Sequence, residues 1–136
     1  IDQAYIGACV GAKLSDLHMA ADVLKGREVP PGKRLLVAPA SAKVTNAAAK
    51  DGTLAILTDA GAVILPSGCG ACAGLGAGLL AAGEVCISST NRNFKGRMGH
   101  AEAEVWLGSP YTVAASAIEG RIADPRPYLQ KCSEAA

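Results

Sequence analysis

Residues 62–78 of this chain read AVILPSGCGACAGLGAG, a short apolar run followed by a glycine-rich segment with two cysteines. The run from Ala62 to Leu65 contains no polar residue, which is typical of a strand covered on both faces of a parallel sheet. Pro66 ends this strand because proline cannot donate a ladder hydrogen bond. The stretch therefore predicts a buried strand whose carboxyl end leads into a loop with Cys69 and Cys72.

Short apolar runs alternate with helical patterns along the rest of the chain. Strands are expected at residues 5–10, 35–38, 62–65, 84–88 and 103–107, and helices at residues 16–25, 42–50, 53–60, 75–82 and 110–119. Ser15 and Ser41 are expected to cap the first two helices, and Gly120 to end the last one. This alternation predicts an α/β fold with a mostly parallel sheet flanked by helices.

Length and composition limit the classes of function. The chain has 136 residues, 50% of them apolar, enough for one domain with a buried core, and disorder is excluded. A net charge of +1 and only 4% aromatic residues argue against nucleic acid and an anionic membrane surface as partners. Residues 60–83 carry no charge, but Pro66 and the many glycines exclude a membrane helix. We therefore expect no nucleic acid and no membrane as partner.

The five cysteines, at positions 9, 69, 72, 86 and 132, do not form the even set of a secreted disulfide framework, and a reducing cytoplasm is expected. The CxxC pair Cys69 and Cys72 can hold one metal ion or one face of a cluster. No second CxxC completes a zinc ribbon, and the glycines around the pair favour an iron–sulfur cluster, with Cys9 as a third sulfur. A small redox or zinc-binding module remains an alternative. Cys86, inside an apolar strand, is interpreted as an inert core thiol.

The segment from Asn91 to Arg97, NRNFKGR, concentrates polar groups directly after a predicted strand. Arg92 and Arg97 offer two planar guanidiniums, which suit bidentate binding of carboxylates. A solvated turn is the alternative. His100 follows this segment and is a weak candidate for moving a proton. Because ligands bind outside the carboxyl ends of parallel strands, we expect the cysteines and this segment to face one crevice.

Several motifs together resemble the aconitase superfamily. In chain order they are IGAC at 6–9, GCGAC at 68–72, GEVC at 83–86, NRNFKGR at 91–97 and GRIADP at 120–125. The last motif and the SP and AA pairs at 109–110 and 114–115 resemble the end of a large subunit in the isopropylmalate dehydratase branch. The resemblance implies that Cys9, Cys69 and Cys72 hold a 4Fe-4S cluster. It also implies that Asn91 lies beside the cluster and that Arg92 and Arg97 bind substrate carboxylates.

For function, the resemblance implies a hydro-lyase that moves a hydroxyl between adjacent carbons of a hydroxy di- or tricarboxylate. The expected substrate is 3-isopropylmalate/2-isopropylmalate, a reaction of leucine biosynthesis, with homocitrate-type and methylmalate-type acids as alternatives. The family has Thr-Asn after the first cluster cysteine, where Val10-Gly11 stand here, and this difference bears on the substrate. A regulatory protein whose cluster-free form binds RNA is a further alternative, against which the neutral charge argues.

The resemblance also predicts how the chain is organised. Residues 1–125 are expected to form a cluster-binding α/β domain, and residues 126–136 a peripheral tail. The chain starts at Ile1 and lacks the acid and base residues of the family, so we expect it to be a piece of a longer large subunit. The expected partners are the remaining large-subunit domains and a small swivelling subunit. Without them, the chain is expected to be inactive.

Overall fold

The computed structural model describes residues 1–7, 12–65, 80–90, 98–99 and 102–128. Within these residues the chain forms one sheet of five parallel strands in the order β3-β2-β1-β4-β5. The strands are β1 (Gln3–Ile6), β2 (Arg34–Val37), β3 (Ala62–Ile64), β4 (Val85–Ser88) and β5 (Glu104–Leu107). The prediction of an α/β fold with a mostly parallel sheet flanked by helices is confirmed.

The described residues include the helices α2 (Leu14–Leu24), α3 (Ala42–Lys50), α4 (Thr53–Asp59) and α5 (Pro110–Glu119), and residues 126–128 are also helical. Ser41 caps α3 as predicted, since its Oγ accepts a hydrogen bond from the backbone N–H of Val44 at 3.2 Å. The prediction that Ser15 caps α2 is wrong, because this helix begins at Leu14. The carboxylate of Asp16 accepts a hydrogen bond from the backbone N–H of Lys13 at 3.0 Å, so it partners an N–H at the helix start.

Residues 80–82, expected at the end of a helix, are not helical. Leu80 instead pairs with Gly99 in an isolated parallel bridge, and its N–H donates to the carbonyl of Met98 at 2.8 Å. The backbone of Leu80 therefore finds its partner in a segment far along the chain. The earlier part of the predicted helix, residues 75–79, lies outside the described residues.

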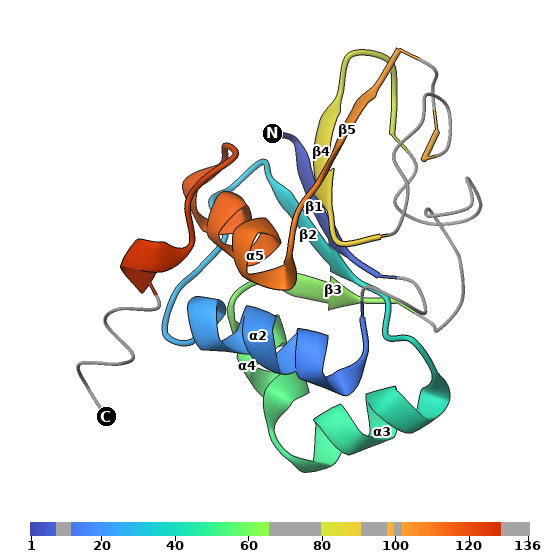
Figure 1. Cartoon of the computed structure of the whole chain (residues 1–136), viewed down its shortest axis with the longest axis vertical. Coiled ribbons are helices and arrows are strands. Elements are labelled where there is room, and N and C mark those ends of the chain that lie inside the picture. The colour runs from blue at the N-terminus through green and yellow to red at the C-terminus, as the bar shows by residue number, and fades with distance from the viewer. Residues whose placement is uncertain (8–11, 66–79, 91–97, 100–101, 129–136) are drawn as a thin grey trace.

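The two faces of the sheet are covered differently. Helices α2, α4 and α5 pack over the first face, with α3 against α2 and α4, and Figure 1 shows them grouped on one side of the sheet. Strand residues Ala4, Ile6, Leu35, Val37 and Ile87 face these helices in the larger apolar core. On the second face, Tyr5, Leu36 and Cys86 pack in a smaller core with Leu80, Met98 and Ala103.

The handedness of the connections explains this division. The chain moves from β1 through β2 to the sheet edge at β3, and then returns past β1 to β4 and β5. Connections between parallel strands are almost always right-handed, so connections that move in opposite directions lie on opposite faces. The connections through α2, α3 and α4 therefore occupy the first face, and Leu80, Met98 and Ala103 lie on the second.

The last described residues pack against the first core. The ring of Tyr128 lies 4.7 Å from the guanidinium carbon of Arg27, and its hydroxyl donates to Glu119 at 3.2 Å. The boundary between domain and tail at residue 125 stays a prediction. Among the described helices, none combines the length and hydropathy that crossing a membrane requires.

Candidate functional site at the carboxyl edge of the sheet

The segments that carry the predicted site residues all follow carboxyl ends of strands. Residues 8–11, with Cys9, follow β1; residues 66–79, with Cys69 and Cys72, follow β3; and residues 91–97, with Asn91, Arg92 and Arg97, follow β4. These six side chains and His100 lie outside the described residues. The described residues fix where each segment starts. Because the sheet is parallel, all three starting points lie at its carboxyl edge, which is the edge formed by the carboxyl ends of the strands.

Backbone hydrogen bonds continue past the strand ends and hold these starting points together. The N–H of Ser89 donates to the carbonyl of Tyr5 at 3.0 Å, and that of Leu65 to the carbonyl of Val37 at 2.7 Å. Ala38 donates likewise to Ile6 at 2.8 Å. The backbone pairing thus continues beyond the ends of β2, β3 and β4, up to the residues that precede two of the predicted site segments.

β1 and β4 flank the topological switch point of the sheet. Each is paired with the other, yet the chain leaves β1 toward β2 and leaves β4 toward β5. In open parallel sheets the connections separate at such a point and leave a crevice outside the strand ends, where ligands bind. The segments with Cys9 and with Asn91 start on its two sides. That their side chains face one crevice at this edge stays a prediction.

Gly7 lies at the switch point in close contact with a buried ring. A Cβ atom on Gly7 would overlap Cε1 of Tyr5 and lie 2.8 Å from Cζ and 3.0 Å from Cδ1. Tyr5 is fully buried in the second core, so its ring has no space to move away. The N–H of Gly7 donates to the Oγ of Ser89 at 3.3 Å. Only a glycine lets the backbone before Cys9 lie this close to the ring.

Three buried hydroxyl residues, Ser88, Ser89 and Thr90, end β4 directly before Asn91. The Oγ of Ser88 accepts the N–H of Thr90 at 3.1 Å and donates to its Oγ1 at 2.8 Å. This local side-chain turn ends the strand. Tyr5 and these hydroxyl residues were not among the site residues predicted from the sequence. A run of three hydroxyl residues at the end of an apolar strand was the available signal.

The far ends of two of these segments also meet. Gly99 has φ +133° and lies so close to Leu80 that a Cβ would be 2.5 Å from the Leu80 nitrogen and would overlap its carbonyl oxygen. Leu80 follows the segment with Cys69 and Cys72, and Met98 and Gly99 follow the segment with Arg97. The two segments are therefore joined by backbone pairing on the second face of the sheet.

A charged network anchors the turn between Leu80 and β4. Glu84 accepts a hydrogen bond from the N–H of Ala81 at 2.8 Å and another from Arg34 at 2.9 Å. The Ala81 N–H, together with the Arg34 guanidinium, holds the pKa of the Glu84 carboxyl below its usual value. Arg34 also donates to Gln3 at 3.0 Å. The start of β4 is thus tied to β2 and β1.

Cys86 does not belong to the site. It is a fully buried free thiol on the second face, with Nε2 of Gln3 3.9 Å from its Sγ. Burial raises the pKa of this thiol to about 12, so it remains neutral at physiological pH. Neutral buried thiols are poor nucleophiles and metal ligands. The interpretation of Cys86 as an inert core residue is confirmed. Cys132 lies outside the described residues.

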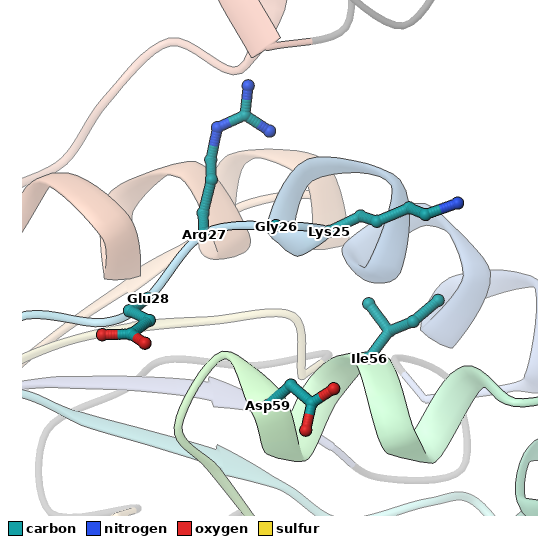
Figure 2. Close-up of a pocket in the computed structure, with 6 residues that line it drawn as sticks. All are labelled: Lys25, Gly26, Arg27, Glu28, Ile56 and Asp59. Carbon is teal, nitrogen blue, oxygen red and sulfur yellow. The ribbon is translucent and has the colours of Figure 1, made fainter.

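The rest of the described surface offers no competing centre. Within the part of the chain that the structure describes, no group of three or more His, Cys, Asp or Glu side chains could hold a metal ion. A pocket of about 400 Å³ lies where α2 and α4 end, at the opposite edge of the sheet, and is lined by Lys25, Gly26, Arg27, Glu28, Ile56 and Asp59. Its charged side chains extend in different directions (Figure 2). They do not converge on one ligand.

Comparison with known proteins finds relatives that are similar to nearly the whole chain. The 3-isopropylmalate dehydratase large subunit 1 of Methanopyrus kandleri is 56% identical over 129 residues, which are 95% of this chain and 31% of that protein. Large subunit 2 of the same enzyme from Archaeoglobus fulgidus is 54% identical, with 95% and 31% covered. The homoaconitase large subunit of Thermus thermophilus is 53% identical over 125 residues, with 92% and 30% covered. The chain thus spans about 30% of the length of these relatives.

A family model also matches most of the chain. The family concerned is the Aconitase family (aconitate hydratase), and it covers residues 1–120. These residues include all five strands, the helices α2 to α5 and every segment that carries a predicted site residue. The chain belongs to the aconitase family.

Proposed function

We propose that this chain is the cluster-bearing domain of an iron–sulfur hydro-lyase that acts on 3-isopropylmalate and 2-isopropylmalate. The observation that supports this proposal most directly is that the segments with Cys9, with Cys69 and Cys72, and with the arginines all start at the carboxyl edge of the sheet. The segments with Cys9 and with the arginines start on the two sides of its switch point. The names of the dehydratase relatives support the substrate. A homoaconitase relative of similar identity supports a longer tricarboxylate as the second candidate.

The residues at this edge fit the proposed 4Fe-4S cluster. Cys9, Cys69 and Cys72 supply three thiols, the donor type that such a cluster requires. At Gly7 a side chain would collide with the ring of Tyr5, and at Gly99 with the backbone of Leu80. Both glycines therefore allow close contacts beside the segments that carry the predicted site residues. When bound, a cluster with three thiolate ligands supplies an open iron that acts as a Lewis acid on the substrate hydroxyl.

Arg92 and Arg97 would bind the substrate carboxylates in this proposal, with Asn91 beside the cluster. A planar guanidinium can pair both oxygens of a carboxylate, which fixes the orientation of the acid. Neutralising the carboxylate also lowers the cost of removing a proton from the adjacent carbon. His100, which follows the arginine segment, is the candidate in this chain for moving a proton.

The assembly would need parts beyond this chain. The relatives are named large subunits, so a small subunit is their partner, and we extend that arrangement to this protein. The remaining large-subunit domains would close the crevice from the opposite side and supply the acid and base. We place the protein in the cytoplasm, where reducing conditions keep cysteine ligands as thiols.

Reconstitution of the chain with ferrous iron and sulfide without oxygen tests the cluster. The expected result is a brown protein that loses one iron in air and regains it from ferrous salts. Cys69→Ser and Cys72→Ser should abolish the colour, whereas Cys86→Ser, the matched control in the core, should keep it. A colourless wild-type chain that binds zinc instead would favour the zinc-binding module.

The substrate is tested on the complete assembly. Formation of the unsaturated acid is followed by absorbance with isopropylmalate and with homocitrate as competing substrates. A higher kcat/KM for isopropylmalate supports the first candidate, and the reverse order supports the homoaconitase reaction.

A further inference from the structure

One hydrogen bond joins the two segments on either side of the switch point. The N–H of Gly7 donates to the Oγ of Ser89 at 3.3 Å, across 82 positions of sequence. Gly7 precedes Cys9 by two positions, and Ser89 precedes Asn91 by two positions. Two residues of chain span at most about 7 Å, so a movement of Gly7 or of Ser89 is transmitted directly to Cys9 or to Asn91.

The backbone of Ser89 is held in place by a hydrogen bond to the neighbouring strand. Its backbone N–H donates to the carbonyl of Tyr5 at 3.0 Å, and the residue is 9% exposed. Tyr5 lies between Leu36 of β2 and Ser88 of β4 in the sheet, and its ring is the one that Gly7 contacts. Gly7 is therefore fixed by two contacts, one with a buried ring and one with a buried hydroxyl.

We propose that Ser89 is a positioning residue that fixes the cysteine segment after β1 relative to the arginine segment after β4. This inference rests on the proposed function. Without the hydroxyl, the strand ends remain paired through the backbone, but the N–H of Gly7 loses its partner. The Cys9 ligand and the carboxylate-binding residues are then less firmly held relative to each other.

The chain offers a matched control for removing this hydroxyl. Ser116 is fully buried, and its Oγ accepts a hydrogen bond from the backbone N–H of Ala123 at 3.0 Å. It lies on α5, away from the strand ends that carry the predicted site. Ser116→Ala thus removes the same kind of hydrogen bond with no link to the switch point. Ser89→Thr keeps a hydroxyl at the original position.

The first measurement needs no cluster. Amide hydrogen exchange at Gly7, followed by NMR, should be about 3- to 10-fold faster in Ser89→Ala than in wild type, the range for one lost hydrogen bond. Ser116→Ala should leave the exchange at Gly7 unchanged, and Ser89→Thr should restore most of the protection. Equal exchange in Ser89→Ala and wild type would show that the bond does not hold Gly7 and would overturn the proposal.

The second measurement uses the reconstituted chain. Iron loss to a ferrous chelator should be several-fold faster in Ser89→Ala than in wild type, Ser116→Ala and Ser89→Thr. Equal rates in Ser89→Ala and Ser116→Ala would overturn the role of Ser89 and leave the proposed function intact. A wild-type chain that takes up no iron–sulfur cluster would overturn the proposed function, and with it this role.

Discussion

Replacing Gly7 by alanine should destabilise the fold through a collision with the ring of Tyr5. The new Cβ would overlap Cε1 and lie 2.8 Å from Cζ and 3.0 Å from Cδ1, whereas ordinary contacts are 3.4–4 Å. Tyr5 is fully buried between Leu36, Leu80 and Cys86, so relief requires movement of the backbone before Cys9 or of the core. Forcing an extra carbon into a packed core costs about 1–3 kcal/mol.

A smaller opposing effect comes from the unfolded chain. Alanine has less backbone freedom than glycine when unfolded, which stabilises the fold by about 0.4–1 kcal/mol where the native conformation allows it. The net loss for Gly7→Ala is then about 2 kcal/mol, because the collision is severe. For a domain of this size, a loss of 2 kcal/mol lowers the Tm by about 6–10 °C.

Circular dichroism melts and urea titrations of the chain provide the assay. Gly108→Ala is the control, because its Cβ would lie 3.3 Å from Cδ1 of Ile87 and from Cβ and Cγ2 of Thr112 without overlapping them, so its Tm should fall much less than that of Gly7→Ala. In Tyr5→Leu the colliding ring is absent, so adding Gly7→Ala should cost much less than it does in wild type. A Gly7→Ala chain as stable as wild type, or additive effects of the two substitutions, would refute the steric argument.

Three further predictions concern the site and its surroundings. Arg97→Lys in the complete enzyme should lower kcat/KM by about 10- to 100-fold with an unchanged cluster spectrum, since lysine keeps the charge but not the bidentate contact; wild-type kinetics would show that the segment is only a turn. Burial raises the pKa of the folded Cys86 thiol to about 12, so as the pH rises the thiol ionises first in the unfolded chain. The free energy of unfolding should therefore fall between about pH 9 and 12, by up to about 1.4 kcal/mol per pH unit. Urea titrations across this range should show a shallower fall in Cys86→Ser, and equal slopes would contradict the assignment. The chain alone, even with a reconstituted cluster, should show no dehydratase turnover in an absorbance assay until the other domains and the small subunit are added, because elimination also needs a base and an acid. Turnover by the chain alone would instead make His100 a catalytic residue.

The local sequence was sufficient for most of the secondary structure. The apolar runs from Leu35 to Ala38 and from Ala62 both form strands as predicted. The first is buried on both faces, but the prediction that the second is covered on both faces is wrong, because β3 lies at the side of the sheet and its Val63 is 54% exposed. Pro110 and Gly120 bound α5 as predicted, since proline suits the first helical turn and Gly120 has φ +72°. The motifs also identified the aconitase family, since cysteines and arginines at fixed spacings are specific to few families.

The local sequence pattern gave a wrong secondary structure where backbone pairing decided the structure. Residues 80–82 have small apolar side chains suited to a helix, yet Leu80 pairs with Gly99, a partner that no nearby residue reveals. The first helix begins before Ser15 because Asp16 already partners the N–H of Lys13. In both cases a backbone N–H donates to a partner that the hydrophobic periodicity of the sequence does not predict.

The sequence by itself determined the α/β class, the spacing of the candidate ligands and the expectation that they follow strand ends. Only the tertiary structure decided that β4 lies beside β1, which places the switch point between the segments with Cys9 and with Asn91. The strand order depends on which apolar faces bury one another across the whole chain, and on right-handed connections that place Leu80 and Met98 on the second face. The hydrogen bond between Gly7 and Ser89 exists only once those strands are paired, because 82 positions of sequence separate the two residues.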